Sequence, residues 1–121
     1  MGYPIKQSRL NQRKKSGLVP GDYDAVVISV DDAPGFVPGD AFRVTYELTR
    51  NGKSYTYHET FINDLGVDRT AEFADYLAKN GIPADDIEQF VGRREKVKLL
   101  KENLGGRGIH LNIVEREMVE V

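Results

Sequence analysis

The chain has 121 residues, 40% of them hydrophobic and 30% charged, which suits one globular domain with a modest core. It contains no cysteine, so disulfides and thiolate zinc sites are excluded. No apolar run is long enough to cross a membrane or to serve as a signal peptide, and we therefore expect a soluble, cytoplasmic protein.

The net charge of -2 hides an uneven distribution of charged side chains. Residues 1–20 hold five of the 17 bases and no acid, which leaves 12 bases against 19 acids, or -7, for the remainder. We expect residues 1–20 to form a basic, flexible arm and residues 21–121 to form one acidic domain. The arm, with Lys14 and Lys15 among its bases, can contact phosphates. The simpler alternative is a disordered, solubilising terminus.

A strand and a loop follow the arm. Its β-branched residues predict a strand from Tyr23 to Val30. Residues 31–40, DDAPGFVPGD, contain Pro-Gly twice and predict a loop. Phe36, in the middle of this loop, either folds back over an edge of the core or contacts a ligand at the loop tip.

The next feature is a β-hairpin. Two alternating segments, 41–50 and 53–62, flank Asn51-Gly52, which is the strongest short signal for a hairpin turn. If these two residues are the centre of the turn, counting outward fixes which residues face each other across the strands. The opposed pairs are Arg50 with Lys53, Leu48 with Tyr55, Tyr46 with Tyr57, Val44 with Glu59 and Phe42 with Phe61.

This register gathers the aromatic rings of both strands on one face of the sheet. The other face carries Thr, Ser, Glu, His and Arg side chains and has nothing apolar to bury. We therefore interpret the rings as core rather than as a platform on which nucleic-acid bases stack. Tyr55, close to the turn, is the ring that we expect to be partly exposed.

Helical spacing begins after the hairpin. Phe73, Tyr76 and Leu77 recur on one helical face and predict a helix of about three turns. Asp68 or Thr70 can cap its start, and a glycine followed by a proline closes its end. A second, short helical segment is expected after that proline.

The chain ends in a second predicted hairpin. Residues 93–102 and 108–118 alternate again, and the glycine-rich tip between them, NLGGRG, bears Arg107. The first of these strands is the most basic feature of the domain, with Arg93, Arg94, Lys96, Lys98 and Lys101. Because lysines also discourage unwanted pairing, this strand is either a phosphate-binding surface or a protected edge.

The order of elements is strand, strand, strand, helix, strand, strand. We expect a mainly β fold with one or two helices, built as a five-stranded Greek-key barrel of the OB type with the helix between the third and fourth strands. Four stretches of the chain also resemble a known family. They are GDYDAVVISV at 21–30, the hairpin at 41–62, FADYLAKNGIP at 73–83, and FVGRREKVKLL leading to GRGIHLNIVE.

These stretches, within about residues 20–117, resemble phage and mobile-element proteins regarded as OB-fold relatives of single-stranded DNA-binding proteins. Such binders usually display aromatic and basic groups on the outer face of the second and third strands. Here Arg43 is the only fixed positive charge on that face away from the turn. The binding residues that we predict are Lys14, Lys15, Arg43, Lys53, Lys96, Lys98 and Arg107 for phosphates, with Phe36 and Tyr55 for stacking.

Two functions are consistent with these features. The first is a nucleic-acid-binding accessory protein, for single-stranded DNA in phage or mobile-element replication or recombination, with weak sequence preference and steep salt dependence. The second is a protein-interaction barrel whose acidic surface recognises a replication or recombination partner. The oligomeric state is left open by the sequence.

Nothing in the sequence indicates catalysis. A nucleophilic side chain beside an oriented base is not recognisable, and NLGGRG lacks the ending of a phosphate-binding loop. His58 and His110 are both expected to face outward, and no carboxylate cluster lies near them in the sequence. We therefore expect a protein that is not an enzyme and that uses no cofactor and no metal.

Overall fold

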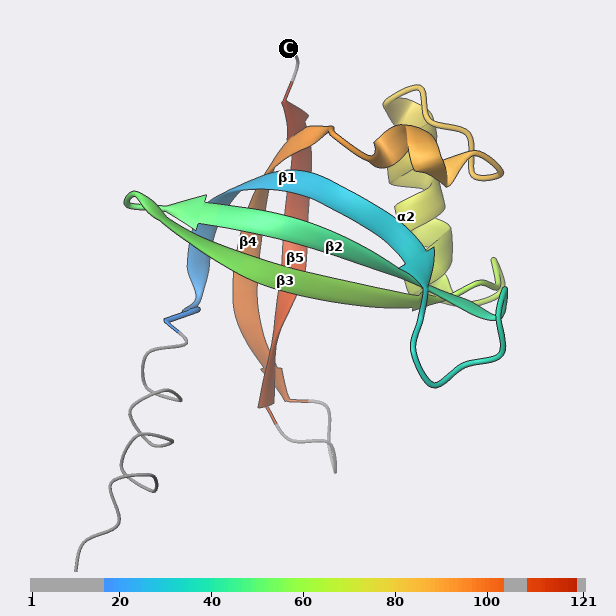
Figure 1. Cartoon of the computed structure of the whole chain (residues 1–121), viewed down its shortest axis with the longest axis horizontal. Helices are drawn as coiled ribbons and strands as arrows, with labels where there is room; N and C mark the ends of the chain where they lie inside the picture. Colours follow the sequence, from blue (N-terminus) through green and yellow to red (C-terminus); the bar gives the residue numbers. More distant parts are fainter. Residues whose placement is uncertain (1–16, 104–108, 120–121) are drawn as a thin grey trace, which may run out of the picture.

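The computed structural model describes residues 17–103 and 109–119, which form one five-stranded antiparallel sheet, one α-helix and one 3-10 helix (Figure 1). The strands are β1 (Gly21–Asp32), β2 (Ala41–Arg50), β3 (Lys53–Ile62), β4 (Arg94–Asn103) and β5 (Ile109–Val119). The helices are α2 (Asp68–Lys79) and the 3-10 helix η1 (Ile87–Phe90). The order across the sheet is β3-β2-β1-β4-β5. A mainly β fold with the helix between the third and fourth strands is thus confirmed.

The hairpin of β2 and β3 has the predicted register. Arg50 lies opposite Lys53, and Phe42 lies opposite Phe61 at the far end. Gly52 has a φ angle of 75° and the residue before it one of 53°, as a two-residue turn of this type requires. Because side chains alternate along a strand, this register places every ring of the hairpin on the inner face.

The inner face of the sheet is the core, as predicted. The buried core residues are Tyr23, Ala25, Val27, Val44, Tyr46, Leu48, Phe61, Phe73, Leu77, Ile82, Phe90, Val97 and Leu99. The rings of Phe61 on β3 and Phe73 on α2 stack with centroids 4.3 Å apart, which fixes the helix against the sheet. Tyr55 is half-buried, in agreement with its place near the turn. The aromatic residues of the hairpin therefore form the core and not an outer stacking platform.

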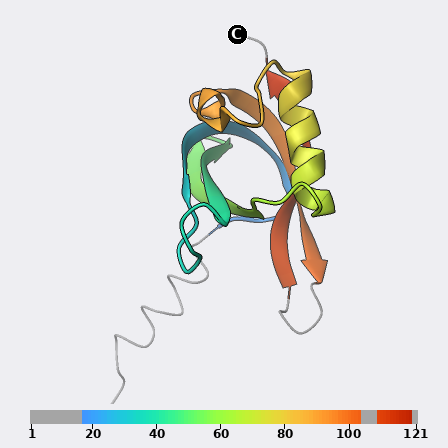
Figure 2. The ribbon, with the colours of Figure 1, turned by 90° about the vertical axis from the view of Figure 1, so that its right-hand side faces the viewer.

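The sheet curls, so that its two edge strands, β3 and β5, face each other (Figure 2). Extra residues bend it at Ile28 on β1 and at Val114 on β5, where the register shifts. Within the described residues no backbone ladder joins the two edges. Instead the Tyr57 hydroxyl on β3 donates to the carbonyl oxygen of Leu111 on β5 at 2.9 Å. The structure therefore confirms one curled sheet but not the expected closed barrel. Between β3 and β5 a side chain makes the hydrogen bond, and no backbone ladder closes the sheet.

The start of α2 differs from the prediction. Its N-cap is Val67, which makes no side-chain capping bond, and Asp68 is already inside the helix. The Thr70 hydroxyl donates to the carbonyl oxygen of Ile62 at 2.6 Å, so it ties the helix to the end of β3. Capping by Asp68 or Thr70 is therefore wrong, because a tertiary contact takes the hydroxyl. The second helical segment is only the four-residue η1.

Candidate binding groove and buried charge cluster

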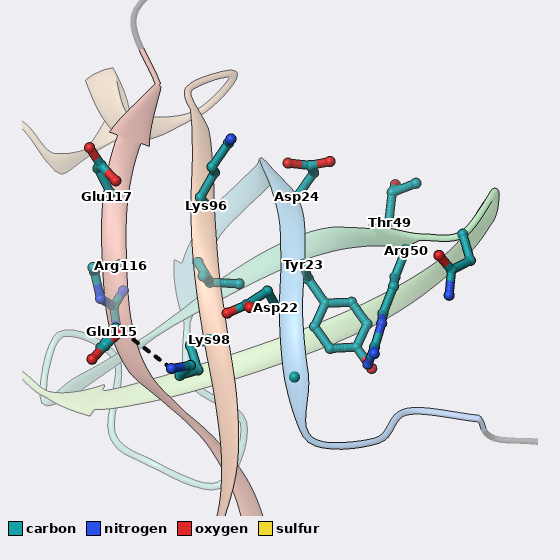
Figure 3. A pocket seen from close by; sticks show the side chains of 13 residues that line it. Asp22, Tyr23, Asp24, Thr49, Arg50, Lys96, Lys98, Glu115, Arg116 and Glu117 are labelled. Carbon is teal, nitrogen blue, oxygen red and sulfur yellow. Dashed lines mark ion pairs between the residues drawn. The ribbon is translucent and has the colours of Figure 1, made fainter.

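An open groove of about 1040 Å³ crosses β1, β4 and β5 (Figure 3). Its walls come from segments far apart in the sequence, because β1 pairs with β4 and β4 pairs with β5. The lining residues are Gly21, Asp22, Tyr23, Asp24, Thr49, Arg50, Asn51, Lys96, Val97, Lys98, Glu115, Arg116 and Glu117. The groove is large enough for a segment of an extended chain.

Acidic and basic side chains alternate across this groove. The rows set by the strand register are Asp22–Lys98–Glu115 and Asp24–Lys96–Glu117. Lys98 Nζ lies 3.9 Å from the Glu115 carboxylate, and this ion pair is partly exposed (Figure 3). The lining holds four carboxylates against four bases when Arg50 and Arg116 are included, so its formal charge is zero. The groove alone therefore attracts polyanions only weakly.

One end of the groove is where the N-terminal arm joins the sheet. Arg50 Nη1 donates to the carbonyl oxygen of Pro20 at 3.2 Å, and its guanidinium lies 5.5 Å from the centroid of the Tyr23 ring. The Tyr23 hydroxyl donates to the carbonyl oxygen of Val19 at 2.7 Å and accepts from its backbone N–H at 3.1 Å. Gly21 permits this approach, since a Cβ there would lie 2.5 Å from Arg50 Nη1. The arm thus leaves the domain at the edge of the groove.

A cluster of charged side chains lies inside the fold, between the edges of β3 and β5. Glu59 is buried on β3 and receives two hydrogen bonds from Arg116 on β5, at 3.0 Å to Oε1 and 2.7 Å to Oε2. The Tyr46 hydroxyl donates to Oε1 at 2.8 Å, and Arg69 of α2 donates to Oε2 at 3.2 Å. A bidentate guanidinium–carboxylate pair is among the strongest polar contacts in proteins. The cluster therefore joins β2, β3, β5 and α2 where no backbone ladder does.

The protonation states around this cluster are fixed by its charges. Burial by itself would lower the pKa of Arg116, but the negative charge of Glu59 raises it above the ordinary value. Burial and the same carboxylate raise the pKa of Tyr57 to about 12. Arg116 therefore stays cationic and Tyr57 stays neutral at physiological pH. These states suit a structural role and not proton transfer.

A second buried carboxyl group, Glu95, points inward from β4. The Tyr76 hydroxyl of α2 donates to its Oε2 at 2.6 Å. Within the described part of the chain no donor reaches its Oε1. Burial raises the pKa of Glu95, and the hydrogen bond from Tyr76 opposes this rise only in part. Glu95 thus has one described hydrogen-bond donor and no guanidinium partner, whereas Glu59 has two guanidinium partners.

The predicted phosphate-binding residues of the fourth strand and of the first hairpin lie near one another. Lys96 and Lys98 line the groove. Lys53 is exposed at the hairpin turn, opposite Arg50, which forms one end of the groove. Phe36 lies at the other end of β1, in the loop before β2, with 46% of its surface exposed. The structure therefore separates Phe36, one of the two predicted stacking rings, from the predicted phosphate contacts Lys53, Lys96 and Lys98.

The other predicted binding residues are less accessible or fall elsewhere. The Tyr55 ring packs edge-on against Tyr23 with centroids 6.2 Å apart and belongs to the margin of the core. Arg43 is half-buried, and its Nε has no hydrogen-bond partner among the described residues. The remaining predicted contacts lie outside the described residues: Lys14, Lys15 and Arg107.

The buried charges were not predicted as site residues, although the sequence carries a signal for them. The hairpin register pairs Glu59 with Val44, and alternation places Glu95 on the same side as Val97. A carboxylate at such a position must be buried and therefore needs a partner. The partner of Glu59, Arg116, is 57 residues away in the chain, and no local pattern connects the two.

Among residues 17–103 and 109–119, no group of three or more His, Cys, Asp or Glu side chains could hold a metal ion. His58 lies on the outer face with its Nδ1 3.0 Å from the Thr45 hydroxyl. In the same described part of the chain, no helix is long and apolar enough to cross a membrane.

Comparisons with protein-family models, with curated proteins and with solved structures find no match. The resemblance to phage and mobile-element proteins therefore stays a prediction that rests on the short motifs quoted above.

Proposed function

We propose that this chain is an OB-type module that binds single-stranded nucleic acid and is not an enzyme. Three structural features support the OB-type assignment: β1 pairs with both β2 and β4, the helix lies between the third and fourth strands, and β3 approaches β5. OB folds bind single strands on the face of their second and third strands and through the loops that follow the first and fourth strands, whereas the groove here crosses β1, β4 and β5. Replication or recombination of a phage or mobile element is the setting that the quoted motifs suggest.

The observation that carries this proposal is the junction of the basic arm with the groove. Arg50 and Tyr23 hold residues 19 and 20 at one end of the groove that Lys96 and Lys98 line. Five bases on the arm can then contact phosphates of a strand that also passes through the groove. Four carboxylates in the groove oppose this attraction, so the arm supplies most of the affinity and the groove supplies position.

The proposal is tested by removing one groove charge. The Lys96→Gln variant and the wild-type chain are titrated into a labelled oligothymidine across a salt series, with fluorescence anisotropy as the readout. We expect the variant to bind several-fold more weakly and its log K against log[salt] slope to fall by about one, because one phosphate contact is lost.

Lys79→Gln is the matched control, since Lys79 is an exposed lysine in the last turn of α2 and lies outside the groove. It removes the same formal charge and is expected to leave both affinity and salt slope unchanged. Equal losses in the two variants would show that only net charge matters, and the groove would then have no part in binding.

A second candidate function, recognition of a protein partner, is favoured by a specific observation. Large apolar side chains stand exposed on two adjoining loops at the end of the sheet opposite the arm: Phe36, Val37, Ile62, Leu65 and Val67. Exposed apolar residues that lie close together mark interaction surfaces, whereas single scattered ones are normal on protein surfaces. Neutralising the groove lysines would leave a protein complex formed through these loops nearly intact.

A further inference from the structure

Five exposed apolar residues lie in or beside two loops that are hydrogen-bonded at their bases, and we call this set the loop patch: Phe36, Val37, Ile62, Leu65 and Val67. Val37 and Leu65 are 67% and 65% exposed, which is high for large aliphatic side chains in a chain of this size. Within residues 17–103 and 109–119 these positions make up half of the ten most exposed large hydrophobic residues. The apolar exposure is therefore concentrated and not scattered.

The two loops are held together by hydrogen bonds around Asn63. Its backbone N–H donates to the carbonyl oxygen of Asp40 at 2.9 Å, and its side-chain amide donates to the carbonyl oxygen of Gly39 at 3.1 Å. The register also places Ala41 opposite Ile62 just behind them. Both loops project from the same end of the sheet (Figure 1). The bases of the two loops that carry the loop patch are thus fixed to each other.

The surroundings of the loop patch are acidic. Residues 31–40 and 62–68 contain five aspartates and no lysine or arginine. The aspartates are all exposed: Asp31, Asp32, Asp40, Asp64 and Asp68. The nearest bases are already engaged or face acids, since Arg69 binds Glu59 and the Thr60 carbonyl oxygen, and Arg43 lies opposite Asp31. The complementary ligand is a basic segment with a few apolar side chains.

The chain itself contains such a segment. Residues 1–16, MGYPIKQSRLNQRKKS, carry five bases, no acid, and the apolar side chains of Tyr3, Ile5 and Leu10. Five positive charges match the five aspartates around the loop patch, and the apolar residues match its exposed side chains. The positive charge of the arm would thus be neutralised by the aspartates around the loop patch.

The position of the arm favours binding to a second copy over binding within one copy. It joins the sheet at Gly21, whereas the loop patch follows the other end of β1, 12 residues and about 40 Å further on. Sixteen extended residues span about 50 Å, so within one copy most of the arm would be used to cross the sheet. The bases nearest Gly21, which are Arg13, Lys14 and Lys15, would stay far from the aspartates. A second copy imposes no such limit.

We propose that the loop patch binds the basic N-terminal arm of a second copy of this chain. Every copy then carries both a donor arm and an acceptor patch, at opposite ends of β1, and the exchange gives a dimer if it is reciprocal or a longer chain of copies if it is not. This inference goes beyond the proposed function and does not depend on it. It predicts self-association that weakens as salt rises.

The test is a labelled peptide of residues 1–16 titrated with the full chain, followed by fluorescence anisotropy at low and high salt, together with sedimentation of the full chain at increasing concentration. We expect saturable peptide binding at low salt, at least tenfold weaker at high salt, and an average mass that rises above that of one chain. Leu65→Ser should weaken peptide binding at least fivefold and reduce the self-association.

Leu100→Ser is the matched control, because Leu100 is 44% exposed on β4, away from the loop patch. It is expected to bind the peptide like the wild type, and circular dichroism checks the fold of both variants. Equal losses in the two variants, or a single-chain mass at every concentration with no peptide binding, would overturn the proposal and leave the loop patch to a foreign protein. Oligothymidine binding separates the failure of this inference from the failure of the proposed function. If only this inference fails, Leu65→Ser binds oligothymidine as the wild type does.

Discussion

At the scale of single residues, the fold contains two buried carboxyl groups in opposite situations. Glu59 lies between two guanidinium groups and a tyrosine hydroxyl. Glu95 has one hydroxyl donor and an Oε1 that no described residue reaches. A buried carboxylate is stable only where its partners offset the loss of water, so Glu59 contributes to the folded state and Glu95 opposes it when ionised.

The two arginines that bind Glu59 allow a matched comparison. The Arg116 side chain is 14% exposed and the Arg69 side chain 53% exposed, although both reach Glu59 Oε2. Arg116→Gln should lower the free energy of unfolding by about 3–5 kcal/mol, because it leaves a buried carboxylate without its main partner. Arg69→Gln should cost about 0–1 kcal/mol, as expected for an exposed pair. Urea denaturation measures both, and equal losses would contradict the assigned role of Arg116.

Glu95 predicts a pH dependence of stability. Its pKa is raised in the folded protein above the ordinary 4.5, so the folded state binds this proton more tightly than the unfolded chain. The contribution of this group to stability is therefore fully present below pH 4.5 and is lost as the pH rises through the folded pKa. Glu95→Gln should have a higher urea midpoint than the wild type at pH 7 and a shrinking advantage toward pH 4. A difference in urea midpoint that stays constant from pH 7 to pH 4 would contradict this role of Glu95.

At the scale of elements, the β2–β3 hairpin is set by its turn. Gly52 adopts a φ of 75°, where an alanine Cβ meets the following carbonyl oxygen. Gly52→Ala should therefore lower the free energy of unfolding by about 1–2 kcal/mol. Outside Gly52 and its two neighbours in the chain, no atom of the described residues lies within 4 Å of the Cβ that alanine would add, so contacts with the rest of the fold cannot explain the loss. Asn51→Gly, which relaxes the neighbouring position, serves as the control and should change stability little.

The hairpin also shows how far a sequence can predict this fold. The pair Leu48–Tyr55 could be derived because two turn residues and strict alternation fix every other pair. The cap of α2 could not, since the Thr70 hydroxyl is taken by Ile62, a contact that depends on how β3 meets the helix. The groove is harder still, because it needs the order of β1, β4 and β5 across the sheet. The prediction of basic strand residues found Lys96 and Lys98 but not the carboxylates opposite them.

At the scale of the whole molecule, charge is divided between an arm and a domain. Residues 1–20 hold five bases and no acid, Arg50 holds the last of these residues, Pro20, at the groove's end, and the domain carries the excess of acid. Under the proposed function, the arm provides the attraction for phosphates, and the groove, whose lining is neutral overall, provides the place where a strand lies. The loop patch at the far end of β1 is a separate surface.

The measurement that tests the proposed function most directly is fluorescence anisotropy of labelled oligothymidine with the full chain over a salt series, beside a duplex of equal length. We predict binding in the micromolar range or tighter at low salt, preference for the single strand, and a steep loss as salt rises. Absence of binding at low salt, or equal binding of duplex and single strand, would contradict the account and leave protein recognition as the function that the structure supports.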